Sequence, residues 1–294
     1  MKFAKIHGAG NDFIIINNID ERIPIDELGE LASALCSRRL SIGADGFMAV
    51  DIPEIGGDFK MHFYNGDGSR AEMCGNGARC VARYGVEKGL CGTEQRIETD
   101  SGMVYGRKIN NSLYKIQLNR VAKVELYNEL DILGKKISYS YLELGESRLP
   151  HIAVPIKGLQ WSEGILLESL GALEDLKKTA ESLRHHSSFT KGANVNFYDV
   201  VGKGEVRILT YERGVEDFTL ACGTGAGATI SALTLMGLVT GNDVKVMVPG
   251  GDLYITAIQK GKEIDELYLT GPTCFVAEGE IKMGSLKQWG HEFR

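Results

Sequence analysis

The chain has 294 residues, 43% hydrophobic and 24% charged, which is the ordinary profile of a globular protein with one or two domains. Its net charge of −6 and pI near 5.6 argue against a nucleic acid or an anionic membrane as partner. The first apolar run, residues 13–16, is too short for a signal-peptide core or a membrane span. The six cysteines are not spaced as metal-binding pairs, so we expect cytoplasmic thiols and no metal site.

Short alternating runs predict strands along the whole chain. In chain order, the expected strands are Phe3–His7, Phe13–Asn17, Phe47–Asp51, Phe59–Tyr64, Val104–Lys108, Tyr114–Leu118, Ile137–Leu144, Asn194–Val200, Val206–Tyr211, Val244–Val248, Leu253–Gln259 and Glu266–Leu269. The expected helices are Ile25–Arg38, Leu167–His185 and one apolar stretch after each of Cys74 and Cys222. Strands joined by glycine turns, with few helices, favour an α+β fold over a doubly wound sheet.

An internal repeat is the most informative pattern in the chain. Cys74 begins the run Cys-Gly-Asn-Gly-Ala, and Cys222 begins the run Cys-Gly-Thr-Gly-Ala, about half the chain length later. Each run follows a strand-like segment and a glycine turn, and a glycine (Gly89 or Gly237) stands at the same distance after each cysteine. The repeat predicts two related halves that face each other.

A Cys-Gly-x-Gly run between a strand and a helix has a chemical consequence. The glycines leave the first backbone N–H groups of the helix unobstructed, and the helix dipole makes that end attractive to anions. A cysteine there is expected to ionise more easily than usual, so that it can give or take a proton near pH 7. A lone cysteine is more often a small buried hydrophobe, but the duplication favours one acid and one base on opposite sides of a substrate carbon. This arrangement suits racemisation or epimerisation by 1,1-proton transfer. Arg79 and Arg83, on the helix after Cys74, are expected to pair with surface carboxylates.

The motifs resemble those of the diaminopimelate epimerase family. The resemblance rests on the run 7–13, on 65–69 leading to 73–80, and on 212–214 leading to 221–225, and it covers essentially the whole chain. It implies two pseudo-symmetric domains, each a mostly antiparallel sheet wrapped around a central helix, with the active site in the cleft between them. The expected domains are residues 1–119 with 271–294, and residues 120–270. The resemblance also implies a homodimer that needs no cofactor, converting LL-2,6-diaminopimelate to meso-diaminopimelate in lysine and peptidoglycan precursor biosynthesis.

Most site residues of the family can be placed on this chain. The resemblance implies that Cys74 and Cys222 are the two acid/base groups, and that backbone donors to the reacting carboxylate come from Gly75, Asn76, Gly223 and Thr224. It implies that Asn11 contacts the substrate and that the distal amino-acid group is bound by Asn65, Asn194, Glu212 and Arg213. It also implies that His151 and Glu212 tune the pKa values of the cysteines. An ordinary surface ion pair with Glu216 or Asp217 is the alternative for Arg213.

Two departures from the family pattern keep other functions open. The family often has Gly-Asn-Pro-His where this chain has Arg-Leu-Pro-His, so Leu149 replaces an expected amide. The stretch from Arg213 to Cys222 also looks one residue longer than in many members. The alternatives are therefore a racemase for another amino acid in the same superfamily, and a non-catalytic binding module on this fold.

Overall fold

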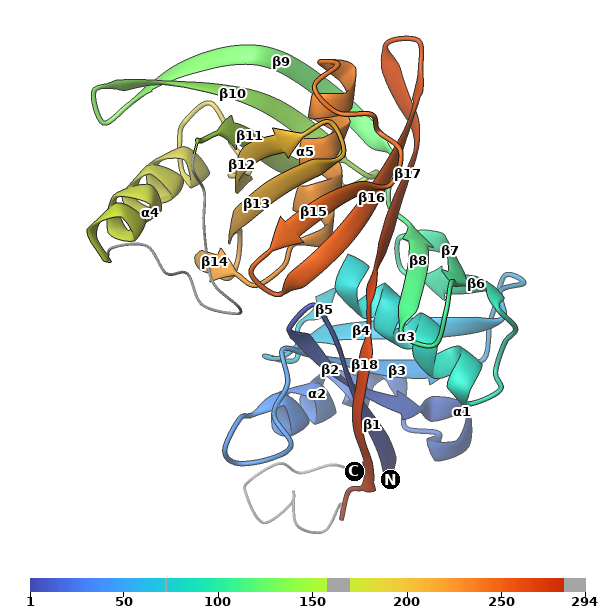
Figure 1. Ribbon diagram of the computed structural model, residues 1–294. Coiled ribbons are helices and arrows are strands. Elements are labelled where there is room, and N and C mark those ends of the chain that lie inside the picture. The colour runs from blue at the N-terminus through green and yellow to red at the C-terminus, as the bar shows by residue number, and fades with distance from the viewer. Residues whose placement is uncertain (72, 158–169, 283–294) are drawn as a thin grey trace. The chain divides into compact units, whose positions relative to one another are not determined.

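The structure is a computed structural model that describes residues 1–71, 73–157 and 170–282 (Figure 1). The chain divides into two compact units. Unit 1 is Met1–Ile116 with the returning segment that begins at Gly271, and unit 2 is Gln117–Thr270. The domain boundaries expected from the sequence, 119/120 and 270/271, stay predictions.

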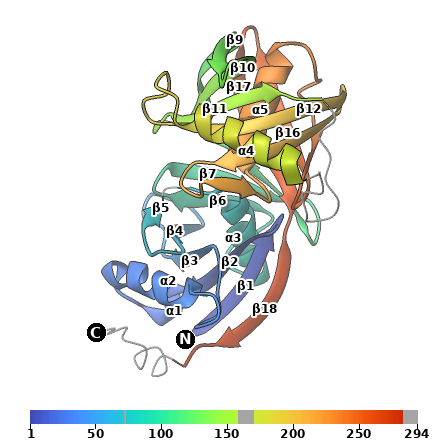
Figure 2. The same cartoon turned by 90° about the vertical axis from the view of Figure 1, so that its left-hand side faces the viewer.

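Unit 1 contains nine strands and three α-helices in its described residues. The strands are β1 (Lys2–Gly8), β2 (Asn11–Asn17), β3 (Gly46–Asp51), β4 (Phe59–Asn65), β5 (Arg70–Ala71), β6 (Glu94–Thr99), β7 (Gly102–Lys108), β8 (Leu113–Gln117) and β18 (Cys274–Glu280). The helices are α1 (Asn18–Glu21), α2 (Leu28–Cys36), preceded by a 3₁₀ turn at Ile25–Glu27, and α3 (Gly75–Glu87). Strand β18 comes from the far end of the chain and lies beside β1 in both views (Figures 1 and 2).

Unit 2 contains the other nine strands and two α-helices of the described chain. The strands are β9 (Val121–Ile132), β10 (Lys135–Leu144), β11 (Leu149–Pro155), β12 (Asn194–Gly202), β13 (Glu205–Glu212), β14 (Asp217–Thr219), β15 (Val244–Val248), β16 (Gly251–Lys260) and β17 (Glu263–Pro272). The helices are α4 (Leu170–Arg184) and α5 (Gly223–Leu235).

The two units pair their strands in the same succession. Unit 1 runs β18–β1–β2–β3–β4–β6–β7–β8, and unit 2 runs β9–β10–β11–β12–β13–β15–β16–β17. In both, the third and fifth pairings are parallel and the others are antiparallel. A short strand also pairs beside the main series at the same place in each, β5 on β4 and β14 on β13. The sequence repeat therefore corresponds to a repeat in topology.

One long helix in each unit packs against strands from distant positions in its sheet. Helix α3 packs on β1, β2 and β7, and α5 packs on β9, β10, β11, β12 and β16 (Figures 1 and 2). Most side chains of both helices are buried, so neither helix has a wide solvated face. Such an all-round burial is what a helix inside a curved sheet requires.

The α+β class expected from the sequence is confirmed, and each expected strand overlaps an observed one. The helix expected at 25–38 is a 3₁₀ turn followed by α2, which ends at Cys36. The helix expected at 167–185 is α4, and its first three expected residues lie outside the described chain. Among the helices that the structure describes, none combines the length and apolar character needed to cross a membrane.

Candidate active site

Cys74 and Cys222 are the N-cap residues of α3 and α5. Both have extended backbone angles, φ −131° and ψ 123° for Cys74, and φ −118° and ψ 107° for Cys222. Each cysteine carbonyl accepts the first helical hydrogen bond, from Ala78 N at 2.7 Å and from Ala226 N at 2.9 Å. The two thiols therefore stand at the positive ends of two helices of equal length, as the sequence predicts.

The second glycine of each motif is required by close packing. A Cβ on Gly77 would lie 2.0 Å from Met48 Cε, and a Cβ on Gly225 would lie 2.1 Å from Asn196 Oδ1. Met48 lies on β3 and Asn196 on β12, the equivalent strands of the two units. The glycines thus let each helix start directly against its sheet, which brings the cysteine to the strand ends.

A set of amide side chains surrounds Cys74 in unit 1. The Cys74 thiol donates to Asn11 Oδ1 at 3.7 Å, and Asn76 Nδ2 donates to the same oxygen at 3.4 Å. Asn11 Nδ2 in turn donates to Asp45 Oδ2 at 2.8 Å. The structure therefore brings two of the predicted site residues, Asn11 and Asn76, to Cys74. Sequence reasoning missed Asp45, whose only signal was its place in a Gly-Ala-Asp-Gly run just before β3.

Cys222 has a different set of partners in unit 2. Its sulfur accepts the N–H of Gly225 at 3.4 Å and lies 3.5 Å from Thr224 Oγ1. The side chain is 5% exposed, whereas that of Cys74 is half-buried. A backbone N–H aimed at sulfur favours the thiolate. The two motifs thus share a backbone frame and differ in the side chains around the sulfur.

The surroundings of Arg79 differ from those expected from the sequence. Arg83 pairs with Glu87 at 2.7 Å, as expected for a helix surface. Arg79 is 0% exposed and, within the described residues, has no ion pair. Its Nη1 donates to Gly75 O at 3.2 Å and its Nη2 to Asn76 Oδ1 at 3.0 Å. The expectation of a surface carboxylate for Arg79 is therefore wrong, because α3 is enclosed by its sheet at this turn.

Asn194 and Arg213 meet in unit 2. Asn194 is 3% exposed, and its Oδ1 accepts the backbone N–H of Arg213 at 2.8 Å. Arg213 is half-buried and its Nη1 donates to Lys191 O at 3.2 Å. The alternative ion pair is not formed in the described chain, since Glu216 pairs with Arg184 and Asp217 with Lys177. Among the described residues the guanidinium of Arg213 has no carboxylate partner, so it can still bind one.

The remaining predicted site residues, Glu212, Asn65 and His151, lie on three different strands. Glu212 is half-buried at the end of β13, beside Arg213. Asn65, at the end of β4, is exposed and donates to Ser69 Oγ at 2.9 Å within its own turn. His151 on β11 is fully buried and lies opposite Asn194 in the parallel register with β12. Burial and the nearby charge of Arg213 lower the pKa of His151 to about 3, so the ring is neutral at pH 7.

Three of the other thiols, those of Cys36, Cys80 and Cys91, are poor acids. Burial raises the pKa of Cys36 to about 12 and that of Cys91 to about 11. It also raises the pKa of Cys80 far above the usual range. These thiols stay protonated at pH 7 and are not candidates for proton abstraction.

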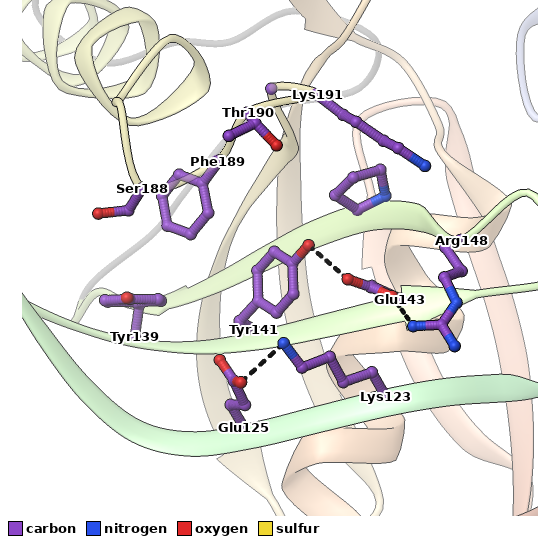
Figure 3. Close-up of a pocket in the computed structure, with 12 residues that line it drawn as sticks. Lys123, Glu125, Tyr139, Tyr141, Glu143, Arg148, Ser188, Phe189, Thr190 and Lys191 are labelled. Atoms are coloured by element: carbon purple, nitrogen blue, oxygen red, sulfur yellow. Dashed lines mark hydrogen bonds and ion pairs between the residues drawn. The ribbon is translucent and has the colours of Figure 1, made fainter.

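A separate cavity of about 350 Å³ opens in unit 2 (Figure 3). Tyr141 and Phe189 stack there with ring centroids 5.5 Å apart, and Glu143 accepts from Tyr141 Oη at 2.9 Å. Arg148 Nη1 lies 3.4 Å from Glu143 Oε2, and Lys123 Nζ lies 2.8 Å from Glu125 Oε1, so four of the charged side chains that line the cavity pair with one another. None of the predicted site residues lines this cavity. In the described part of the chain, no group of three or more His, Cys, Asp or Glu side chains is placed to hold a metal ion.

Comparison with known proteins gives matches along almost the whole chain. The family model for diaminopimelate epimerase matches residues 3–118 and 150–276. A diaminopimelate epimerase of Carboxydothermus hydrogenoformans is 34% identical over an alignment of 293 positions, which covers 95% of this chain and 99% of that protein. One from Aquifex aeolicus is 35% identical over 292 residues, covering 96% of this chain and 98% of that protein.

Solved structures share the fold at low sequence identity. A hydroxyproline epimerase from Agrobacterium vitis, with bound trans-4-hydroxy-L-proline, has a TM-score of 0.69 and 17% identity over 96% of this chain and 90% of its own. A methylitaconate-delta-isomerase has a TM-score of 0.68 and 14% identity over 97% of each chain. The extent of the family match and the identity to its members together show that this chain belongs to the diaminopimelate epimerase family.

Proposed function

We propose that this member of the family converts LL-2,6-diaminopimelate to meso-diaminopimelate with Cys74 and Cys222 as its two acid/base groups. The observation that carries the proposal is the duplicated N-cap cysteine, at the start of two helices whose first turns present backbone N–H groups. In this scheme the two motifs face one substrate carbon from opposite sides, in a cleft between the two domains.

The reaction then needs two proton transfers and no other reagent. A thiolate on one side takes the α-proton, and the electron pair left on carbon delocalises into the α-carboxylate. The N–H groups at Gly75, Asn76, Gly223 and Thr224 would stabilise that negative charge, which the helix dipoles also favour. The thiol on the other side gives its proton to the opposite face of the carbon. One cysteine has gained a proton, the other has lost one, and the stereocentre is inverted.

A second group of residues would bind the distal half of the substrate. Arginine binds a carboxylate through two parallel hydrogen bonds, and Arg213 has no carboxylate partner among the described residues. Glu212 would attract the distal ammonium group, and Asn65 and Asn194 would add neutral contacts. Asn11 would contact the substrate beside Cys74, where the structure describes it. His151 would tune the site as a neutral ring.

A racemase for a less polar amino acid is the second candidate. Leu149 is the first residue of β11, where the family pattern offers an amide, and an apolar side chain there favours a less polar substrate. We further infer a cytoplasmic homodimer. A reducing compartment would keep both catalytic thiols available, and the family resemblance implies the dimer.

Alanine variants test the two-cysteine scheme. Cys74→Ala and Cys222→Ala should each lower the rate of LL-diaminopimelate epimerisation by at least about a thousandfold, because each removes one of two obligatory proton carriers. Cys91→Ala and Cys274→Ala are the matched controls and should keep most of the activity. A single motif variant with near wild-type activity would show that the scheme is wrong. Faster turnover of a monocarboxylate such as histidine by the wild type would instead favour the racemase.

A further inference from the structure

Arg79 is a buried cation at the helix end that least favours a cation. Its side chain is 0% exposed and folds back toward the first turn of α3, where Nη1 bonds to Gly75 O at 3.2 Å. The N-terminal end of a helix carries partial positive charge, so a guanidinium there is disfavoured. A charge without water or counter-charge is also costly. Such a group is retained in a stable fold only when a nearby negative group offsets these costs.

The described surroundings of Arg79 contain few groups that can supply this negative charge. On β2, Asp12 is paired with Lys5 and Arg38, at 3.0 and 2.7 Å. On the other elements packed against α3, β1 carries Lys2, Lys5 and His7, and the buried positions of β7 are Val104 and Gly106, which are neutral. Asp45, which faces Asn11, also pairs with Arg38, at 2.9 Å.

Two thiols remain close to the guanidinium, and they differ in acidity. Cys80 is fully buried, and burial raises its pKa so far that it stays a thiol. Cys74 is half-buried at the helix N-cap, where a thiolate is favoured. Among the described groups beside Arg79, Cys74 is therefore the one that can acquire a negative charge.

We propose that Arg79 is a positioning residue for the reaction: it orients the amides around Cys74 and stabilises the Cys74 thiolate. The inference rests on the proposed catalytic role of Cys74.

The orientation follows from the hydrogen bonds. Arginine can only donate, so Arg79 Nη2 fixes Asn76 with Oδ1 toward itself, at 3.0 Å. Asn76 Nδ2 must then point the other way, where it donates to Asn11 Oδ1 at 3.4 Å. The carboxylate of Asp45 can only accept, which fixes Asn11 from its other end. Asn11 Oδ1 is thereby shared between the Asn76 amide and the Cys74 thiol. Because the oxygen is shared, the hydrogen bond that it accepts from the Cys74 thiol is weaker, and the thiol loses its proton more easily.

The positive charge of Arg79 also favours ionisation of Cys74. Burial lowers the pKa of Arg79 to about 10, and negative charge on Cys80 or Cys74 would raise it. The interaction is reciprocal, so a charged Arg79 favours ionisation of Cys74. Loss of the guanidinium therefore removes both effects, and both losses raise the pKa of Cys74.

The rate of Cys74 alkylation as a function of pH measures the pKa of this thiol directly and does not depend on catalytic activity. Iodoacetamide labelling against pH, with peptide mapping to separate Cys74 from Cys222, gives the ionisation midpoint of each thiol. In Arg79→Met the Cys74 midpoint should rise by about one unit or more, so that labelling at pH 7 is about tenfold slower. Its kcat/KM should fall similarly at pH 7 and recover as the pH is raised. Arg79→Lys keeps a donor-only cation and should restore part of the loss.

Two further variants separate this role from a structural one. Arg83→Met removes a cation one turn further along α3 that already pairs with Glu87, and it should leave the Cys74 midpoint unchanged. Asn76→Asp is nearly isosteric and gives Arg79 a buried counter-charge. It should raise the melting temperature or leave it unchanged, and still raise the Cys74 midpoint. This variant decides the question if Arg79→Met fails to fold.

An unchanged Cys74 midpoint in folded Arg79→Met, or in Asn76→Asp, would overturn the inference. Full epimerase activity of Cys74→Ala would overturn the proposed function instead, whatever the labelling shows. The two failures are therefore distinguishable.

Discussion

At the scale of single residues, His151 and Arg213 show how burial decides the role of a charged group. His151 has no exposed surface, and neither ring nitrogen has a hydrogen-bond partner in the described chain. Arg213 is half-buried and keeps access to water. The first is therefore held neutral by the fold, whereas the second stays charged and able to recognise an anion.

The neutral state of His151 makes stability depend on pH. Its pKa is about 3 in the folded chain, chiefly through burial, against an ordinary value of 6.5. Because the folded value is the lower one, this contribution to stability is fully present above pH 6.5 and is lost as the pH falls toward 3. Below pH 6 we expect the free energy of unfolding to fall by about 1.4 kcal/mol per pH unit from this group. Urea unfolding of His151→Leu should show a shallower decline with falling pH than wild type, and equal slopes would refute the assignment.

Arg213 gives a prediction about substrate recognition. Arg213→Met should raise KM for LL-diaminopimelate by about ten- to a hundredfold, because a carboxylate loses a bidentate partner. The lower part of that range is expected, since the side chain is half-exposed. Lys177→Met removes a nearby cation that pairs with Asp217, and it is the control that should keep the wild-type KM. No change of KM in Arg213→Met would place the distal carboxylate elsewhere.

At the scale of elements, alternation of apolar residues was enough to predict twelve of the strands, and the cysteine motifs predicted both N-caps. Strand β11 was missed because Pro150 cannot donate to a ladder, which a strand tolerates only near its start or at an edge. Strand β9 was missed because charged residues occupy many of its exposed positions. The burial of Arg79 could not be predicted either, since it depends on β1, β2 and β7 closing over α3.

Gly77 and Gly225 occupy the same place in the two cysteine motifs, so their alanine variants can be compared directly. A Cβ at Gly77 would displace Met48 Cε, the free end of a flexible side chain. A Cβ at Gly225 would displace Asn196 Oδ1, which accepts from Thr210 Oγ1 at 2.9 Å while Asn196 Nδ2 donates to Ile152 O at 3.1 Å.

Gly225→Ala should therefore lower the free energy of unfolding by about 2–4 kcal/mol, from overpacking and a broken hydrogen bond. Gly77→Ala should cost less, because the methionine can move and alanine favours a helix by about 1 kcal/mol over glycine. Urea unfolding of the two variants tests the order, and a larger loss for Gly77→Ala would contradict it.

At the scale of the whole molecule, the two units repeat the same series of strand pairings around equivalent helices, and each helix begins at a cysteine. In the proposed scheme each half of the repeat supplies one proton carrier, and inversion of the carbon centre uses both. The repeat would then explain how the chain catalyses the reaction with its own side chains.

The stereochemical fate of the proton tests the two-cysteine scheme most directly. Thiol protons exchange with solvent, so the enzyme in D₂O carries deuterium on the sulfur that acts as the acid. With LL-diaminopimelate, early product should contain deuterium at the inverted carbon, while the remaining substrate should contain almost none. NMR or mass spectrometry of both isomers measures this. Product that keeps the original proton, or substrate that gains deuterium as fast as product forms, would contradict a reaction with one base on each side.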